Sequence, residues 1–188
     1  MIKLNRMMSS FARQVGDCCL VRDVRGVSAV EFALVLPLMV GLYLGLTEIS
    51  QAIAIDRKVT LTARALSDLA SQAPSTISNA DMTNILSAST SVMAPFVTTT
   101  LAVTVSAINI DSTGKATIGW SDTRGGTARS VGSSITIPSA LATPSSQLIL
   151  SEVSYGYKPA IGYTITGTLT MADKMYMTPR VNKITRTS

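Results

Sequence analysis

The most apolar stretch of the chain is residues 32–46 (FALVLPLMVGLYLGL), fifteen positions without a charged side chain. Counted from Val27, the apolar segment reaches twenty residues, with Glu31 included. About 20 apolar residues can cross a bilayer as a helix, whereas about 10–14 are more typical of a core helix or a secretion signal. The pattern therefore predicts a membrane-spanning helix that begins at Val27.

Beyond this run the helical pattern continues in amphipathic form. Apolar side chains recur about every 3.6 residues, and most charged side chains fall off this stripe. The stripe consists of Ile49, Ile53, Val59, Ala63, Leu66 and Ala70. No glycine or proline interrupts residues 46–73, and Pro74 ends the pattern. We predict one long helix over Val27–Gln72, although a span followed by a separate short helix fits the same residues.

From Thr98 onward the apolar period changes to two, which is typical of strands. Residues 101–110 alternate apolar and polar side chains, and the alternation moves one step out after Val105, which predicts a β-bulge near Ser106–Ala107. A turn at 111–114 (DSTG) then leads into a returning strand at 115–121.

A second pair of strands is predicted at 147–157 and 163–171, and Ser78 or Asp81 can cap a short helix at 81–93. A helical region followed by neighbouring strands indicates the α+β class. The expected fold is a long N-terminal helix, membrane-spanning in its first half and amphipathic in its second, followed by a small antiparallel β-sheet domain.

The basic residues are concentrated at the N-terminus. The chain has 16 Lys and Arg against 11 Asp and Glu, and residues 1–26 hold five of the former and two of the latter. Positive residues favour the cytoplasmic side of a membrane span. We therefore predict a basic cytoplasmic leader at 1–26, the helix at 27–73, and a periplasmic or extracellular β-rich domain at 74–188. No basic face elsewhere indicates nucleic-acid binding.

Candidate chemistry is sparse. Histidine is absent from the sequence, which excludes Ser-His-Asp and Cys-His catalysis and histidine-ligated metal sites. Cys18 and Cys19 are adjacent, a spacing at which disulfides rarely form. The S-x-x-K match at 112–115 is explained by turn chemistry. We expect no catalytic residue, cofactor, metal or small-molecule substrate.

Three tyrosines near the C-terminal end of the sequence could form a binding stripe, but a buried face of the sheet is the better interpretation. They are Tyr155, Tyr157 and Tyr163.

Small or ring-closed side chains recur at every fourth position of the predicted span. They are Ala29, Ala33, Pro37, Gly41 and Gly45. Such stripes let membrane helices approach closely, so we predict that this one packs against a partner helix. Pro37 removes the hydrogen bond to the Ala33 carbonyl, and a kink is expected there.

Two carboxylates, Glu31 and Glu48, flank the span. Their separation of seventeen residues corresponds to ~25 Å of helix, close to the ~30 Å thickness of the hydrocarbon layer. Glu48 is expected only to mark the outer end of the span, with water available. Glu31 lies beside the start of the apolar run, where a carboxylate needs a partner or a function.

Residues 25–32 (RGVSAVEF) resemble the type IV prepilin processing site, in the Glu-Phe/Tyr variant of Flp (Tad) pilus systems. The resemblance implies cleavage after Gly26 by a prepilin peptidase, with Val27 as the new N-terminus. It also implies that Glu31, followed by Phe32, contacts a neighbouring subunit through that subunit's free α-amine. A carboxylate in lipid-like surroundings does require such a cation.

Residues 26–46 as a whole resemble the TadE-like (TadE/TadG-like) family of Flp pilus assembly proteins, and residues 57–72, 110–121, 153–158 and 177–184 resemble its later blocks. The resemblance implies a minor pilin or pseudopilin that contacts other pilus subunits and Tad assembly proteins. It would be a single-pass protein of the bacterial inner membrane with a periplasmic C-terminal domain.

A different class of function remains open. Ala52-Ile53-Ala54 fits a signal-peptidase site, and cleavage after Ala54 would release a secreted or surface-tethered binding module. Signal sequences usually have short basic regions, however, and here 31 residues precede the apolar run. An uncleaved anchor is the third alternative. The mature N-terminus distinguishes the three: Val27, Ile55 or Met1.

Overall fold

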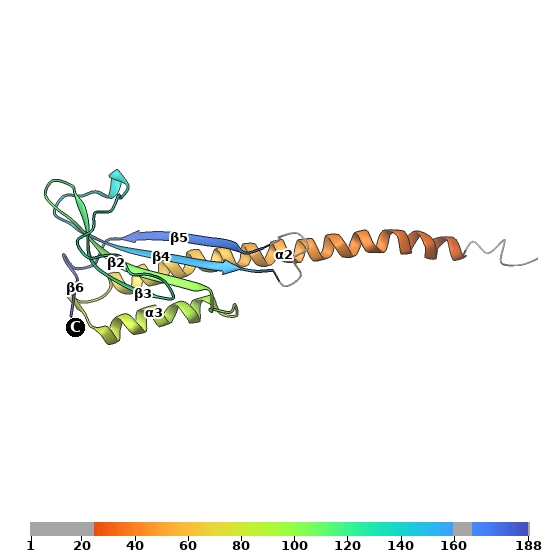
Figure 1. The fold of residues 1–188 in the computed structure, drawn as a ribbon, viewed down its shortest axis with the longest axis horizontal. Coiled ribbons are helices and arrows are strands. Elements are labelled where there is room, and N and C mark those ends of the chain that lie inside the picture. The colour runs from red at the N-terminus through yellow and green to blue at the C-terminus, as the bar shows by residue number, and fades with distance from the viewer. Residues whose placement is uncertain (1–24, 160–166, 188) are drawn as a thin grey trace, which may run out of the picture. The chain divides into compact units, whose positions relative to one another are not determined.

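The computed structural model describes residues 25–159 and 167–187. The chain divides into two compact units, Met1–Leu46 and Thr47–Ser188, here called the N-terminal and C-terminal units. Most of the predicted leader, both cysteines and Tyr163 lie outside the described residues. The elements follow the order α2 (Arg25–Ser71), β1 (Thr76–Ile77), α3 (Asn79–Met93), β2 (Leu101–Ile110), β3 (Ala116–Arg124), a 3₁₀ turn (Ser139–Leu141), β4 (Gln147–Tyr157), β5 (Leu169–Met177) and β6 (Thr185–Arg186) (Figure 1).

Helix α2 is one continuous helix of 47 residues. Its bounds confirm the prediction over Val27–Gln72 and exclude the alternative of a separate second helix. At its C-terminal end the backbone N–H of Arg180 donates to the Ser71 carbonyl at 3.0 Å, which satisfies one of the carbonyls that a helix end leaves open. Pro37 lies inside the helix, and the kink there stays a prediction.

The main sheet has four strands in the order β3-β2-β4-β5, and each neighbouring pair is antiparallel. The α+β prediction is thus confirmed. Two-residue strands β1 and β6 form a separate parallel pair, with Thr76 opposite Thr185, which the sequence analysis did not predict. Strand β4 has the predicted bounds.

The last strand of the main sheet was placed wrongly from the sequence. We expected it at 163–171, but β5 runs from Leu169 to Met177. Gly167 has a left-handed φ of +93°, which breaks an extended strand just before β5. Asp173 and Lys174 then lie on an edge strand, where charged side chains stay in water and obscure the alternation.

The predicted bulge is present in the ladder but in the other strand. Ala107 pairs with Trp120 and Ile108 with Ile118, so Gly119 is the extra residue, in β3. The register between β2 and β4 runs without a shift at the same place. A Cβ at Gly119 would lie 2.6 Å from the side-chain amide of Asn109, so a larger residue here would require that amide to move.

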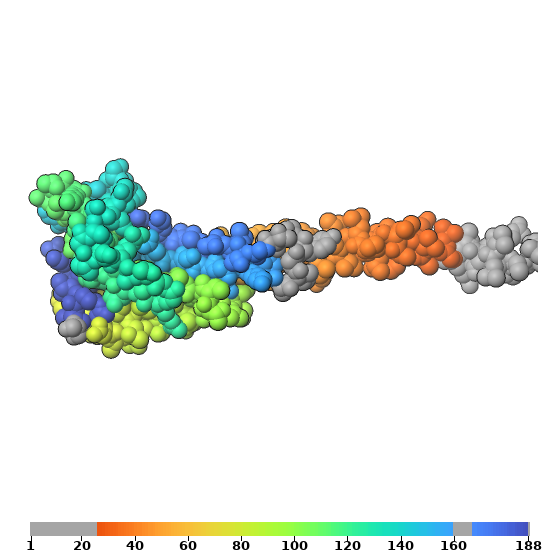
Figure 2. Space-filling model, in the orientation of Figure 1, coloured from red at the N-terminus to blue at the C-terminus, as the bar shows by residue number. Residues whose placement is uncertain are grey.

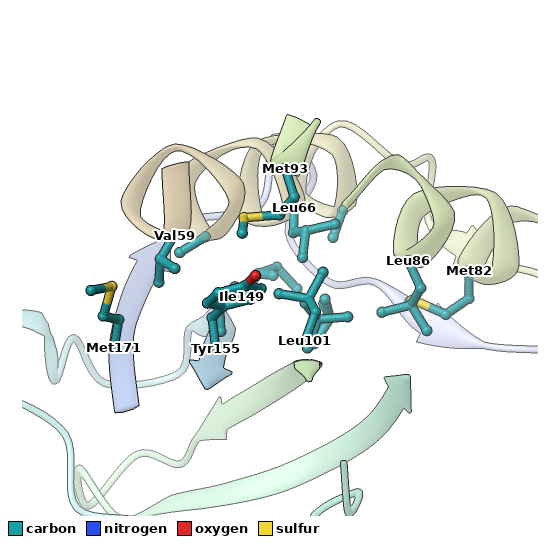
Figure 3. Close-up of a cluster of buried hydrophobic side chains, with 14 of the residues drawn as sticks. Val59, Leu66, Met82, Leu86, Met93, Leu101, Ile149, Tyr155 and Met171 are labelled. Atoms are coloured by element: carbon teal, nitrogen blue, oxygen red, sulfur yellow. The ribbon is translucent and has the colours of Figure 1, made fainter. Parts of the chain in front are cut away.

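One face of the sheet packs under both helices (Figure 3). In this view Val59 and Leu66 from α2 and Met93 from α3 point toward Ile149 and Tyr155 of the sheet. Lys58 links the two helices, because its Nζ donates to the Val92 carbonyl at 2.9 Å. The second half of α2 is therefore a core element of the C-terminal unit.

Helix α3 begins two residues before the predicted start. Ser78 is its N-cap: the Ser78 Oγ accepts from the Asp81 N–H at 3.2 Å, and the Asp81 Oδ2 accepts from the Ser78 N–H at 3.1 Å. The Ser78 Oγ also donates to the Asp81 Oδ2 at 2.6 Å, and this hydrogen bond, followed by the one from the Ser78 N–H, lowers the pKa of Asp81. Both residues proposed as caps thus act together as a capping box.

The opposite face of the sheet holds a second, smaller apolar cluster at the far end of β2. It contains Ile108, Ile110, Ala116, Ile118, Leu148 and Leu150. Ile135, Ile137 and Leu141 cover it, and Figure 2 shows the teal segment after β3 as the outer layer of this end. The apolar side chains of β2 therefore change face because its two ends are covered on opposite sides.

Candidate functional site: the N-terminal helix

The N-terminal unit exposes an apolar helix surface. Large side chains there are mostly more than two-fifths exposed; they include Val27, Val30, Phe32, Leu34, Leu38, Met39, Leu42, Tyr43 and Leu46. Among the described residues, the helix at 26–71 is long and apolar enough to cross a membrane, and its most apolar window is not buried. A core helix of a soluble domain would be buried. This surface therefore fits lipid or partner helices.

The residues of the predicted processing site lie on the first turns of α2. Gly26, Val27, Glu31 and Phe32 are all exposed. A Cβ built on Gly26 meets no atom within 4 Å, so the fold of the described chain does not require glycine there. Within residues 25–159 and 167–187, none of the ion pairs involves Glu31. The fold of the described residues therefore gives neither Gly26 nor Glu31 a structural role, and their predicted roles involve a peptidase and a neighbouring subunit.

The predicted packing stripe is exposed over its first three positions. Ala29, Ala33 and Pro37 are exposed, Gly41 is half-buried and Gly45 is buried. Close packing against a partner helix therefore stays a prediction for all five positions.

Glu48 contradicts the expectation of a water-exposed marker, because it is only 4% exposed. It faces the sheet with Tyr157, whose pKa is raised by burial and, next, by the Glu48 carboxylate. Tyr157 Oη also lies 3.5 Å from Oε1 of Gln51, one turn along α2. Glu48 thus lies at the edge of the buried core and is not exposed to water.

Glu48 is buried because the buried side of α2 near the span is formed by other residues than those of the expected stripe. Ile49 and Ile53, which we assigned to the same apolar stripe as Val59, are 42% and 50% exposed, whereas Ala52 and Ile55 are buried. The run Ala52-Ile55-Val59 keeps a spacing of three and four residues, and Glu48 precedes it by one turn. This spacing is the signal in the sequence that would have placed Glu48 inside.

The tyrosine prediction is confirmed for the two described residues. Tyr155 and Tyr157 are buried on the helix-covered face of the sheet.

The S-x-x-K match at 112–115 is a turn: Oδ1 of Asp111 accepts from the N–H groups of Thr113 and Lys115 at 2.8 and 2.9 Å. In the described ranges no group of three His, Cys, Asp or Glu residues could hold a metal ion.

The polar face of the sheet has a bidentate ion pair that the sequence analysis did not identify. Arg129 donates from Nε and Nη2 to the two carboxylate oxygens of Glu152, each at 2.7 Å. This contact raises the pKa of Arg129 and holds the segment after β3 over the sheet. Glu152 also borders a cavity of ≈ 390 Å³ with Thr104 and Lys174.

Comparison with known proteins gives one finding. The family described as TadE-like protein matches residues 26–67. No curated protein and no solved structure matches the chain. The matched segment includes both the exposed apolar half of α2 and most of its buried half. The match confirms the resemblance over residues 26–67, whereas the resemblance of residues 110–121, 153–158 and 177–184 stays a prediction.

Proposed function

We propose that the chain is a membrane-anchored minor pilin or pseudopilin of a bacterial Tad (Flp) type IV pilus. The TadE-like match over residues 26–67 carries this proposal. The matched helix is exposed and apolar at its start and buried in a sheet domain at its end. Such a subunit works by helix packing and protein–protein contacts, with other pilus subunits and Tad assembly proteins as partners.

The continuity of α2 supports an anchor over a secretion signal. Cleavage after Ala54 would cut the helix between Ala52 and Ile55, which are both buried in the core. It would also place a new charged α-amine on Ile55, which is only 2% exposed, and burying an unpaired charge is costly. The release of a soluble module after Ala54 is accordingly disfavoured.

The proposed topology places the leader in the cytoplasm and the C-terminal unit in the periplasm. The leader holds five Lys and Arg residues, more than the Arg57, Lys58 and Arg64 that follow the span. A reporter fused after Ser188 that is active only in the periplasm should therefore give signal, and one that is active only in the cytoplasm should not. The reverse pattern would contradict the orientation.

Processing after Gly26 leads to a prediction for Gly26→Val. A peptidase that accepts glycine before the scissile bond has little room for a branched side chain, so we expect an uncut precursor, 26 residues longer than the processed wild type. The mass of the purified protein measures this. Because a Cβ at this position meets no atom within 4 Å, the thermal unfolding of the variant should match that of wild type. A variant processed like wild type would rule out this site.

A further inference from the structure

Strand β5 leaves one edge of the main sheet unpaired. It is the last strand in the order β3-β2-β4-β5, and within the described ranges no further strand pairs with its outer side. Such an edge offers backbone N–H and C=O groups to an added strand. An extended segment of another molecule can therefore join the sheet at β5.

The backbone groups of β5 that face outward follow from the ladder. Just before β2, Oγ1 of Thr100 donates to the Gly156 carbonyl at 2.8 Å, so the backbone groups of Gly156 point toward β2. Thr170 lies opposite Gly156, and in an antiparallel ladder its backbone groups then point away from β4. Thr170 and, two positions on, Ala172 therefore direct their N–H and C=O groups to the outer edge, and both residues are exposed.

This edge is open over a short stretch only. The N–H of Lys174, the next residue that faces outward, already donates to Oδ1 of Asp173 at 2.8 Å. The open stretch, residues 169–172, coincides with one wall of a groove of ≈ 440 Å³. The other wall belongs to α2 and consists of Ala52, Ile53 and Asp56. A strand added at this edge would place alternate side chains in the groove.

The groove combines apolar side chains with carboxylates. Ile53 is 50% exposed and Leu169 is 41% exposed, one on each wall. Asp56 borders the same groove, and Asp173 lies two positions after the buried Met171, on the same face of β5. None of the ion pairs among the described residues involves Asp56 or Asp173. The groove thus fits apolar side chains and a neighbouring cation.

We propose that the outer edge of β5 and the flank of α2 bind an extended segment of another protein, antiparallel to β5. The segment has apolar side chains opposite Leu169 and Met171 and a lysine or arginine opposite Asp173, and it adds a fifth strand to the sheet. The site lies within the C-terminal unit, so it goes beyond the proposed pilin function and does not depend on the membrane anchor.

A second copy of β5 is a poorer occupant of this edge. The side chains that it would place on the helix-covered face include no cation for the two carboxylates. They are Leu169, Met171, Asp173, Met175 and Met177. Charge complementarity therefore favours a basic segment from a different protein.

The test uses the detergent-solubilised full chain and a fluorescently labelled peptide of sequence TKTVTVT, blocked at both ends. We expect saturable binding by fluorescence anisotropy. Asp56→Asn combined with Asp173→Asn should weaken it by roughly 2- to 25-fold, because two exposed charge pairs are lost. Asp68→Asn, on the same helix but outside the groove, should not weaken it. Unchanged affinity in the double variant, or an equal loss with Asp68→Asn, would overturn the assignment of the cation.

Ala172→Pro tests the strand pairing. Proline removes the outward N–H of this residue but no hydrogen bond to β4, so peptide binding should be lost while thermal unfolding, followed by the fluorescence of Trp120, stays close to that of wild type. A peptide methylated at the two amides that would face β5 should also fail to bind. Binding that survives either change would overturn the strand addition, as would no binding of the unmodified peptide at millimolar concentration. A dimer that Ala172→Pro dissociates would mean that a second copy occupies the edge, which overturns the proposed partner.

Discussion

Glu31→Gln should insert into the membrane and be processed normally, yet fail to co-purify with its assembly partners. In the proposed assembly, Glu31 pairs with the α-ammonium of a neighbouring subunit. Removing one partner of a buried charge pair typically costs about 2–5 kcal/mol, because the other charge is left buried and unpaired. That corresponds to a loss of affinity of roughly 30-fold to several thousand-fold.

The matched control for this variant is Asp56→Asn. Asp56 lies on the same helix and is exposed, so the same change from carboxylate to amide should leave the recovery of partners unchanged. Glu48 is unsuitable as a control because it is buried. Equal recovery of pilus components with Glu31→Gln and Asp56→Asn would reduce Glu31 to a residue that marks the edge of the span.

Leu66→Ala should strongly destabilise the C-terminal unit. Leu66 is fully buried between α2 and the sheet, and truncating a buried leucine to alanine typically costs about 2–5 kcal/mol through lost burial and the remaining cavity. Trp120 is the single tryptophan of the chain and lies in the same core. Its fluorescence during urea unfolding of the detergent-solubilised protein therefore measures the change.

Leu61→Ala provides the comparison on the opposite side of the helix. Leu61 is 51% exposed, and an exposed substitution of this kind usually changes the free energy of unfolding by less than about 0.5 kcal/mol. Similar losses for Leu61→Ala and Leu66→Ala would contradict the packing of α2 through its Leu66 face.

The elements predicted well from the sequence are those with a long, one-sided pattern. Helix α2 and strand β4 have many repeats of their periods, and they match the predicted bounds closely. The phase of α2 was wrong near Glu48, because the helix is apolar on both sides close to the span, and the inner and outer stripes look alike in the sequence. Periodicity identifies a helix more reliably than it identifies the buried side.

Short, non-local elements carry no such pattern. Strands β1 and β6 have two residues each, and their pairing depends on contacts across more than 100 positions. Arg186 holds β6 through a bidentate pair with Asp122 at 2.8 and 3.0 Å, and Gln147 accepts from the Ile184 N–H at 2.7 Å. These contacts join residues that lie far apart in the sequence, so no local pattern predicts them.

The candidate site, too, was predictable only where its residues are contiguous in the sequence. The motif at 25–32 was recognisable because it is contiguous, whereas the roles proposed for Gly26 and Glu31 depend on a peptidase and a neighbouring subunit. The clustering of Glu48 with Tyr157 joins residues 109 positions apart, and only the fold brings them together.

The N-terminal residue of the protein extracted from membranes decides between the pilin-like anchor and its alternatives. Mass spectrometry of the intact chain and of its N-terminal peptide distinguishes the three forms. We expect a membrane-bound protein that begins at Val27. A protein that begins at Ile55 and is recovered in the soluble fraction would contradict the anchor, and a membrane-bound chain that still begins at Met1 would contradict processing after Gly26.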